Sequence, residues 1–439
     1  MEIIIQITQF ILSLSLLIVL HELGHMIPAK YFKTKVEKFY LFFDAGFSLF
    51  KVKKGETEYG IGWIPLGGYV KIAGMIDESM DKDQMKEPAK PWEFRSKPAW
   101  QRLIIMVGGV TVNLFLGYFI YIMMLFVWGS SYIQNDSVKY GGHLNDKSFE
   151  KYGFQDGDLI TSVDGEKIIE YGAAEKMILI EGKRNIEINR NGQIIPITIS
   201  DSIVSNLLKL KVSGIFNKFP RSTNVIDSVF PNKPADLAGL MKGDSIVAIN
   251  DNSVIFFQDF KQKISENSNK TVELSFYRNG ELKKLSLEVD PNGEIGYSSK
   301  TNFQLQFKEY SLIESFPAGI IAGTETLGTY VKSLSLIFNK EGAKQIGGFG
   351  TIGKLFPTNW NWYVFWQMTA LLSIILAFMN ILPIPALDGG HVMFLIYEMI
   401  TGRPPSDKFL TGAQVVGMTL LFALLIYANG MDIYRWIAG

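Results

Sequence analysis

The chain has no cysteine, few histidines and no excess of charge of either sign. Its 439 residues include 43 Lys and Arg, 43 Asp and Glu, and only four His. The absence of cysteine excludes disulfide bonds and thiolate metal sites, so only His, Asp and Glu remain as imidazole or charged ligands for a metal ion. Because the net charge is zero, the chain shows no basic footprint, and we expect no nucleic-acid partner.

Charge is also scarce in four long apolar stretches, at residues 3–29, 103–128, 360–387 and 409–429. The uncharged run that opens the first stretch would be about 27 Å long as a helix, close to the thickness of the hydrocarbon core. With 47% hydrophobic residues, the chain is predicted to be a multi-domain protein that crosses a lipid bilayer four times. Glu2 and the lack of an A-x-A site favour a first span over a signal peptide.

Basic residues give these spans an orientation. Lys and Arg are concentrated between the first and second spans, and Arg403 and Lys408 lie between the third and fourth. Cytoplasmic loops carry an excess of positive charge, so we expect both loops to be cytoplasmic. Both termini and the large central region are then expected on the outer side.

The densest chemistry lies at the end of the first stretch, in His21-Glu22-Leu-Gly-His25. On a helix, residues at i and i+4 share a face about 6 Å apart, so both imidazoles can bind one metal ion. Glu22 is placed to act as general base in hydrolysis, as in other H-E-x-x-H helices. The alternative is a pair of ordinary core histidines, but ionisable residues in a membrane-length apolar segment favour a functional site.

The third stretch ends in a second polar motif, from Asn380 through Pro383 and Pro385 to Asp388 and His391. Prolines at the end of a membrane helix unwind it, and irregular backbone at that depth requires protein or a water-filled cavity around it. A carboxylate at Asp388 can complete a His, His, Asp zinc shell. Such a shell leaves a fourth position for water, which is the catalytic arrangement.

Residues 44–74, in the first loop, are predicted to form β-hairpins. Gly67 and Gly68 follow Pro65 and precede Tyr69, as expected for a strand that another chain approaches closely. The alternative is an ordinary cytoplasmic hairpin.

The central region contains a duplicated unit. Gly157-Asp158 recurs as Gly243-Asp244, and Arg190-Asn-Gly recurs as Arg278-Asn-Gly. Each Asn-Gly indicates a hairpin between strands, so two similar β-rich domains are predicted, at 131–212 and 213–305.

Both units resemble bacterial PDZ domains, which bind extended chains at a sheet edge. By this resemblance, Gly214, Ile215 and Phe216 are placed like the carboxylate-binding loop of the second copy. The alternative is that both domains are spacers without a ligand. In either case, residues 1–130 and 306–439 are expected to supply the two halves of the membrane core. The second half begins with an amphipathic helical linker.

Taken together, these motifs resemble the bacterial site-2 proteases, and most closely the regulator-of-sigma-E group of intramembrane zinc metalloproteases. The resemblance implies a four-span α-helical core with a membrane-associated β-element and two PDZ domains. It implies His21, His25 and Asp388 as Zn²⁺ ligands and Glu22 as catalytic base. It further implies that Gly67 to Tyr69 pair with the substrate. The other residues expected to bind the substrate are Asn380, Asn113, Pro383 and Pro385.

Two positions bear on the details of this resemblance. Asn113 matches the asparagine of the family's G-P-x-x-N motif in the second span, whereas Val110 replaces its proline and leaves a helix break there open. His391 is not used as a ligand in the family and is expected to support the site.

The same resemblance implies substrates and a location. The expected substrates are single-pass membrane proteins, either an anti-sigma factor or signal-peptide remnants, already shortened by an upstream site-1-type protease. The expected location is the bacterial inner membrane, with the PDZ domains on the periplasmic side. These domains either recruit a new C-terminus or exclude large ectodomains, and their outer position favours exclusion.

Two other functions fit parts of the sequence. A non-catalytic PDZ-bearing scaffold would need neither Glu22 nor a third metal ligand. A zinc transporter would need polar ligands through several spans, whereas the second and fourth spans contain no His, Asp or Glu.

Overall fold

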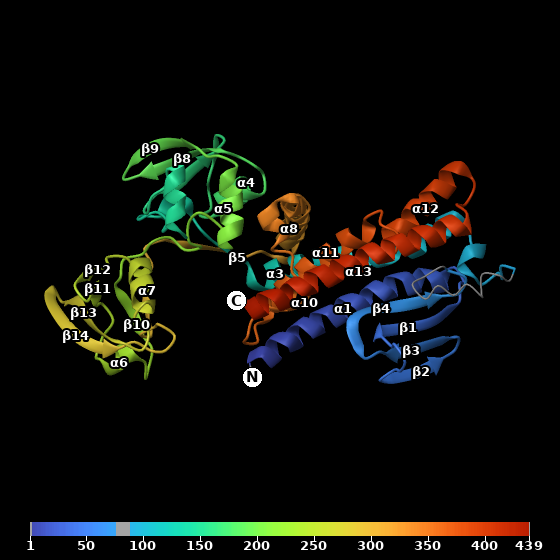
Figure 1. Cartoon of the computed structure of the whole chain (residues 1–439), viewed down its shortest axis with the longest axis horizontal. Coiled ribbons are helices and arrows are strands. Elements are labelled where there is room, and N and C mark those ends of the chain that lie inside the picture. Colours follow the sequence, from blue (N-terminus) through green and yellow to red (C-terminus); the bar gives the residue numbers. More distant parts are fainter. Residues whose placement is uncertain (1, 76–87, 439) are drawn as a thin grey trace. The chain divides into compact units, whose positions relative to one another are not determined.

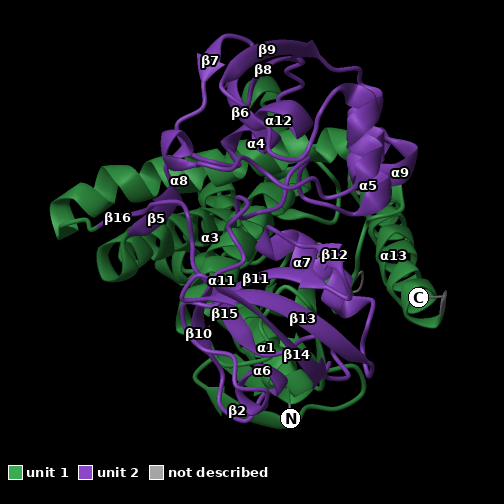
Figure 2. Cartoon of the chain, turned by 90° about the vertical axis from the view of Figure 1, so that its left-hand side faces the viewer, with its two compact units in different colours: residues 1–129, 309–337, 343–439 green, residues 130–308, 338–342 purple. Residues whose placement is uncertain are grey.

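The computed structural model describes residues 2–75 and 88–438. The chain divides into two compact units, shown in different colours in Figure 2. Unit 1 comprises residues 1–129, 309–337 and 343–439, and unit 2 comprises residues 130–308 and 338–342.

Unit 1 contains four helices that are long and apolar enough to cross a membrane. They are α1 (Glu2–Tyr31), α3 (Ala99–Trp128), α11 (Trp362–Ile381) and α13 (Asp407–Ala438). The predicted number of spans is thus confirmed among the described residues, with different bounds. The third helix ends at Ile381 instead of residue 387, because Pro383 and Pro385 follow and cannot continue its hydrogen bonding.

The membrane helices of unit 1 approach closely where glycines meet. A Cβ atom on Gly24 of α1 would lie 2.5 Å from the carbonyl oxygen of Gly108 in α3. Polar contacts add to this packing, since the hydroxyls of Ser13 and Thr369 lie 2.9 Å apart between α1 and α11. Small residues and buried hydroxyl pairs are how membrane helices associate without a hydrophobic driving force.

A four-stranded sheet lies beside α1 in unit 1 (Figure 1). Its strands are β1 (Val36–Phe43), β2 (Phe50–Lys54), β3 (Thr57–Ile61) and β4 (Ile64–Ile72), in the order β2-β3-β1-β4. The predicted element at 44–74 is therefore wrong in its bounds, because it omits β1. The strand β4 pairs with β1 and not with its neighbour in sequence, and such non-local pairing leaves no turn signal.

The remaining helices of unit 1 connect these elements. They are α8 (Leu312–Ser333), α10 (Phe349–Gly353) and α12 (Asp388–Thr401). Ser311 and Glu314 form a capping box at the start of α8, which matches the amphipathic helix predicted at this point. Gly323 of α8 packs against Tyr118 of α3, since a Cβ there would lie 2.5 Å from the ring.

Unit 2 contains two sheets with the same strand order, β7-β6-β8-β9 and β12-β11-β13-β14. The first comprises β6 (Leu159–Val163), β7 (Glu166–Lys167), β8 (Asn185–Arg190) and β9 (Gln193–Thr198), with α4 (Ala173–Leu179) and α5 (Ser202–Leu210). The second comprises β11 (Ser245–Ile249), β12 (Asn252–Ser253), β13 (Thr271–Arg278) and β14 (Glu281–Glu288), with α6 (Pro234–Leu237) and α7 (Phe257–Ser265). The short helix α9 (Lys340–Ala343) follows much later in the chain. The repeated sequence therefore has a repeated structure.

The repeated residues make the same buried ion pair in both domains. The Nε of Arg190 donates to Oδ1 of Asp158 over 2.7 Å, and the Nε of Arg278 donates to Oδ1 of Asp244 over 2.7 Å. Each arginine also donates to the carbonyl oxygen of a glycine five residues before its aspartate, Gly153 or Gly239. A two-point guanidinium bond fixes the hairpin of each sheet against its glycine turn.

The segment with Gly214, Ile215 and Phe216 belongs to the first of these domains. Leu144 pairs with Phe216, and the backbone N–H of Asn145 donates to the carbonyl oxygen of Ile215 over 2.9 Å. The prediction that this segment is the carboxylate-binding loop of a second domain that starts at residue 213 is therefore wrong.

The corresponding strand of the second domain is β15 (Tyr297–Ser299), which pairs with β10 (Ile226–Val229). Each domain is closed by a segment from beyond the C-terminal end of its repeat, an isolated bridge at Phe216 in the first domain and β15 in the second, which the spacing of repeats does not reveal. At the border of unit 2, β5 (Ser130–Ile133) pairs with β16 (Leu305–Lys308), so residues 130–308 begin and end in one two-stranded ribbon.

Candidate metal centre

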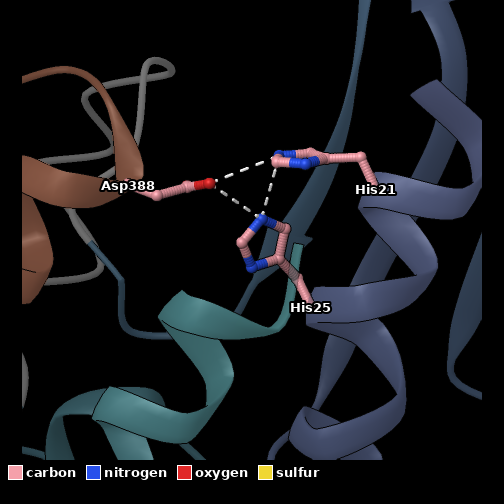
Figure 3. A group of neighbouring side chains, drawn as sticks. All are labelled: His21, His25 and Asp388. Atoms are coloured by element: carbon pink, nitrogen blue, oxygen red, sulfur yellow. Dashed lines mark hydrogen bonds and ion pairs between the residues drawn. The ribbon is translucent and has the colours of Figure 1, made fainter. Parts of the chain in front are cut away.

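Three side chains of unit 1 converge on one point, as Figure 3 shows. His21 and His25 project from one face of α1, and Asp388 is the first residue of α12. The two Nε2 atoms lie 3.2 Å apart, and each lies 3.3 Å from Oδ2 of Asp388. The structure therefore brings together three predicted residues that are more than 360 positions apart in the chain at their extremes.

This arrangement fits a tetrahedral zinc ion. Zinc bonds of roughly 2.0 to 2.1 Å place neighbouring ligand atoms about 3.3 Å apart, which matches all three separations. The buried Oδ2 of Asp388 has no hydrogen-bond partner. A buried carboxylate oxygen without a donor is costly, and a cation between the three atoms would remove that cost.

Hydrogen bonds to the other ring nitrogens orient the imidazoles. The Nδ1 of His25 lies 2.8 Å from the carbonyl oxygen of Ile105, which can only accept, so Nδ1 carries the proton and Nε2 is free to bind a metal. The Nδ1 of His21 lies 3.2 Å from the side-chain amide of Asn113. The oxygen and nitrogen of this amide can be exchanged by a flip of the side chain, which places Oδ1 next to Nδ1 of His21. In that orientation Oδ1, which otherwise has no hydrogen-bond partner, accepts the Nδ1 proton.

A glycine in α3 makes room for both rings. A Cβ on Gly109 would lie 2.3 Å from Nε2 of His25 and 2.7 Å from Cε1 of His21. We did not predict this residue, although the Gly-Gly pair at 108–109 in an apolar stretch was a signal for close packing. The helix α3 runs unbroken through the buried Val110, which answers the question that the missing proline raised.

The loop before Asp388 is held from the fourth membrane helix. Ala386 has φ of +79°, an unfavourable conformation for a residue with a side chain. Its backbone N–H donates to Oε1 of Gln414 in α13 over 3.1 Å, and Gly417 of α13 packs against the carbonyl of Pro385. Sequence reasoning missed Gln414, which lies in a stretch that reads only as a span.

Two further predicted residues occupy different places near the centre. The side-chain amide nitrogen of Asn380, near the end of α11, lies 3.4 Å from Nε2 of His21. His391 lies one turn into α12, and within the described residues it is not part of the cluster around Asp388.

The edge strand β4 reaches the segment of α1 that contains Glu22. The backbone N–H of Val70 lies near the carboxylate of Glu22. A Cβ on Gly68 would lie 2.5 Å from Ile18 and 3.7 Å from Cγ of Glu22, so the strand backbone lies directly against α1. Tyr69 points away from this contact, since its hydroxyl donates to Asp44 over 2.9 Å.

A second cluster lies in unit 2 and was not predicted. Its members are His143, Asp156 and Asp259. The Nη2 of Arg221 lies 3.5 Å from Oδ2 of Asp259. The cationic guanidinium of Arg221 thus already lies next to a carboxylate of this cluster. The cluster is therefore explained as an ion-pair network.

Comparison with known proteins agrees with the geometry. A family model described as peptidase family M50 matches residues 9–424. The chain is similar to the regulator of sigma E protease of Haemophilus influenzae, with 26% identity over 97% of this chain and 98% of the relative. It is also similar to proteins named "Putative zinc metalloprotease" from Neisseria meningitidis, with 27% identity over 97% and 98%, and from Borreliella burgdorferi, with 28% over 96% of each.

Proposed function

Because the chain belongs to peptidase family M50, the site-2 proteases, and is a zinc metalloprotease with membrane-spanning helices, we propose that it cleaves peptide bonds in or near the transmembrane segments of single-pass membrane proteins. The observation that carries this proposal is the convergence of His21, His25 and Asp388 between apolar helices. The nearby carboxylate of Glu22 supplies the base that such a reaction requires.

In this proposal His21, His25 and Asp388 hold the zinc ion through Nε2, Nε2 and Oδ2. When bound, zinc supplies Lewis acidity that polarises a carbonyl group and lowers the pKa of water. Glu22 takes a proton from the attacking water and delivers it to the leaving nitrogen of the cleaved peptide bond. Asn380, beside His21, is placed to donate a hydrogen bond to the substrate, whereas Asn113 orients the His21 ring.

The strand β4 is proposed to hold the substrate. A transmembrane helix hides its carbonyls in internal hydrogen bonds, so it must unwind before water can attack. An unwound segment needs new backbone partners, and an edge strand offers them. The contacts of Gly68 and Val70 with α1 and Glu22 support this role, because they put the strand backbone beside the proposed base.

This role gives a prediction for Gly68→Pro. Proline removes a backbone donor, and its side chain collides with Ile18, so we expect cleavage to fall by about tenfold or more, while zinc stays bound. The matched control is Lys53→Pro in β2, the exposed strand at the opposite edge of the same sheet, because the register places the backbone N–H of Lys53 on the outer edge as well. Zinc content and cleavage rate are measured on both purified variants. Equal cleavage rates for the two variants would show that β4 does not bind the substrate.

The two β-rich domains of unit 2 are proposed to be PDZ domains that act as a size filter. Their repeated sheets and hairpins support the PDZ assignment, and the charge distribution of the loops supports an outer, periplasmic location. A filter would admit only substrates whose ectodomain another protease has already removed. Recruitment through a free carboxylate is the alternative for either domain.

The filter can be tested by deletion. Because Ile133 pairs with Leu305, residues 134–304 can be replaced by a two-residue Asn-Gly turn that keeps the β5–β16 ribbon. The shortened enzyme is expected to cleave a substrate that keeps its folded ectodomain, which the full chain refuses. Both enzymes are compared on long and trimmed forms of one substrate by fragment size. Continued refusal of the long form with loss of cleavage of the trimmed form would instead support recruitment.

For the substrate class, we propose an anti-sigma factor or signal-peptide remnants in the bacterial inner membrane. The naming of the Haemophilus relative as a regulator of sigma E protease supports the first of these. The test is co-expression of the chain with candidate single-pass proteins. A shortened fragment that appears only with the active enzyme identifies a substrate, and its absence for every anti-sigma candidate would exclude that class.

A further inference from the structure

The segment from Gly214 to Phe216 holds a carboxylate that belongs to the chain itself. The backbone N–H of Ile215 donates to both carboxylate oxygens of Glu175 in α4, over 3.2 Å each. The backbone N–H of Phe216 donates to Oε1 of the same residue over 3.3 Å. Two successive amides that point at one carboxylate are a common anion-binding arrangement of the backbone.

The surroundings fix these amides in place. The side chain of Ile215 is fully buried, and the ring of Phe216 makes an edge contact with Phe154 at 5.8 Å between centroids. A Cβ on Gly214 would lie 2.5 Å from the carboxylate carbon of Glu175. A side chain at position 214 would therefore push the carboxylate out, which explains the glycine.

The neighbouring strand edge is also occupied from within. The hydroxyl of Tyr171, just before α4, donates to the carbonyl oxygen of Asn217 over 3.0 Å. A peptide that added a strand along residues 215–217 would need the same amides and this carbonyl. Glu175 and Tyr171 thus use the groups that such a peptide would use.

The side chain of Glu175 is half-buried. Burial raises its pKa to about 7, against the opposing effect of the hydrogen bonds from Ile215 and Phe216. This distinguishes the contact from a surface carboxylate that merely lies near two amides.

The second domain lacks this device. The buried positions of its helix α7 correspond to those of α4: Ala174 and Ile178 in α4 match Phe260 and Ile264 in α7. In that correspondence Glu175 is replaced by Lys261, which is exposed. The internal carboxylate is thus specific to the first of two domains that share one architecture.

From these contacts we propose that residues 214–216 form a carboxylate-binding site which Glu175 occupies. The ligand that Glu175 excludes is the free C-terminal carboxylate of a peptide lying as an added strand along residues 215–217. The first domain is then closed to chain ends until Glu175 moves out. This proposal does not depend on proteolysis, so its test needs no cleavage assay.

The test is amide hydrogen exchange of the full chain in detergent micelles. Glu175→Ala is expected to speed exchange at Ile215 and Phe216 by about tenfold or more, since both amides lose their acceptor. Added propionate should restore protection, whereas propionamide should not. The control is Glu170→Ala, which removes an exposed carboxylate five residues earlier and should change nothing. Unchanged exchange in Glu175→Ala, or equal protection by propionate and propionamide, would overturn the site.

Two further measurements complete the test. Acetyl-Ala-Ala-Val with a free carboxylate should protect residues 215–217 of Glu175→Ala at lower concentration than propionate does. If it protects no better than propionate, the proposed peptide ligand is wrong.

If Glu175→Ala unfolds the domain, exchange will also rise in β8, and the Gly214→Ala variant then decides. That variant displaces the carboxylate and fills its place, so faster exchange confined to 215–216 without rescue by propionate supports the site, and unchanged exchange rejects it.

Discussion

Glu22→Gln is expected to lower the rate of substrate cleavage by about 10² to 10⁴-fold or more while zinc remains bound in stoichiometric amount. Glutamine keeps the shape of the side chain and keeps an oxygen that can lie near the backbone N–H of Val70. It cannot take a proton from water at neutral pH. Glu22 is not one of the three residues whose ligand atoms converge. The substitution should therefore lower turnover without lowering metal content.

The measurement is zinc per chain and cleavage rate on the same purified sample. Glu56→Gln is the control, since Glu56 is an exposed residue at the β2–β3 turn and the chemical change is identical. If the chain were a non-catalytic scaffold, Glu22→Gln would be silent. Cleavage by this variant at close to the native rate would assign the base to another residue.

The second large effect concerns Asp388, the proposed metal ligand on α12. Asp388→Asn replaces an anionic oxygen by a neutral one of similar shape, so we expect zinc affinity to fall by more than the roughly 10 to 100-fold that loss of an outer hydrogen-bond partner costs. His391→Ala, one turn further along the same helix, should keep zinc in stoichiometric amount. Both variants are dialysed against a chelator of known affinity, and the retained zinc is measured.

The pair of substitutions is informative because both residues follow the same proline-containing loop. His391→Ala also serves as the control for damage to α12, since both variants alter its first turn. Loss of zinc from His391→Ala with retention by Asp388→Asn would move the third ligand from the carboxylate to the imidazole.

The sequence predicted the convergence of His21, His25 and Asp388 better than it predicted the packing around them. His21 and His25 share a helix face by periodicity alone, and Asp388 followed from the proline-containing loop together with the family resemblance. Gly109 and Gln414 were missed, because each acts only through a helix far away in the chain. An apolar stretch shows that a helix spans a membrane, but not which of its residues face a neighbour.

The β-rich parts show the same limit. Repeats in the sequence correctly predicted two similar sheets, since the Asp158–Arg190 pair and its counterpart recur with the hairpins. The closing segment at 214–216 was assigned to the wrong domain, and β1 was not predicted. In both cases the partner strand is not the neighbour in sequence, so neither turn residues nor repeat spacing indicate the pairing.

Mass spectrometry of the cleavage products tests the proposed intramembrane proteolysis most directly. The zinc-loaded enzyme is reconstituted in lipid vesicles with a trimmed single-pass substrate, and both new termini are identified. We expect the broken bond to lie in or at the border of the apolar segment, with both fragments absent when Glu22→Gln replaces the native enzyme. A cut confined to the soluble part of the substrate, or the same fragments from Glu22→Gln, would contradict the proposed function.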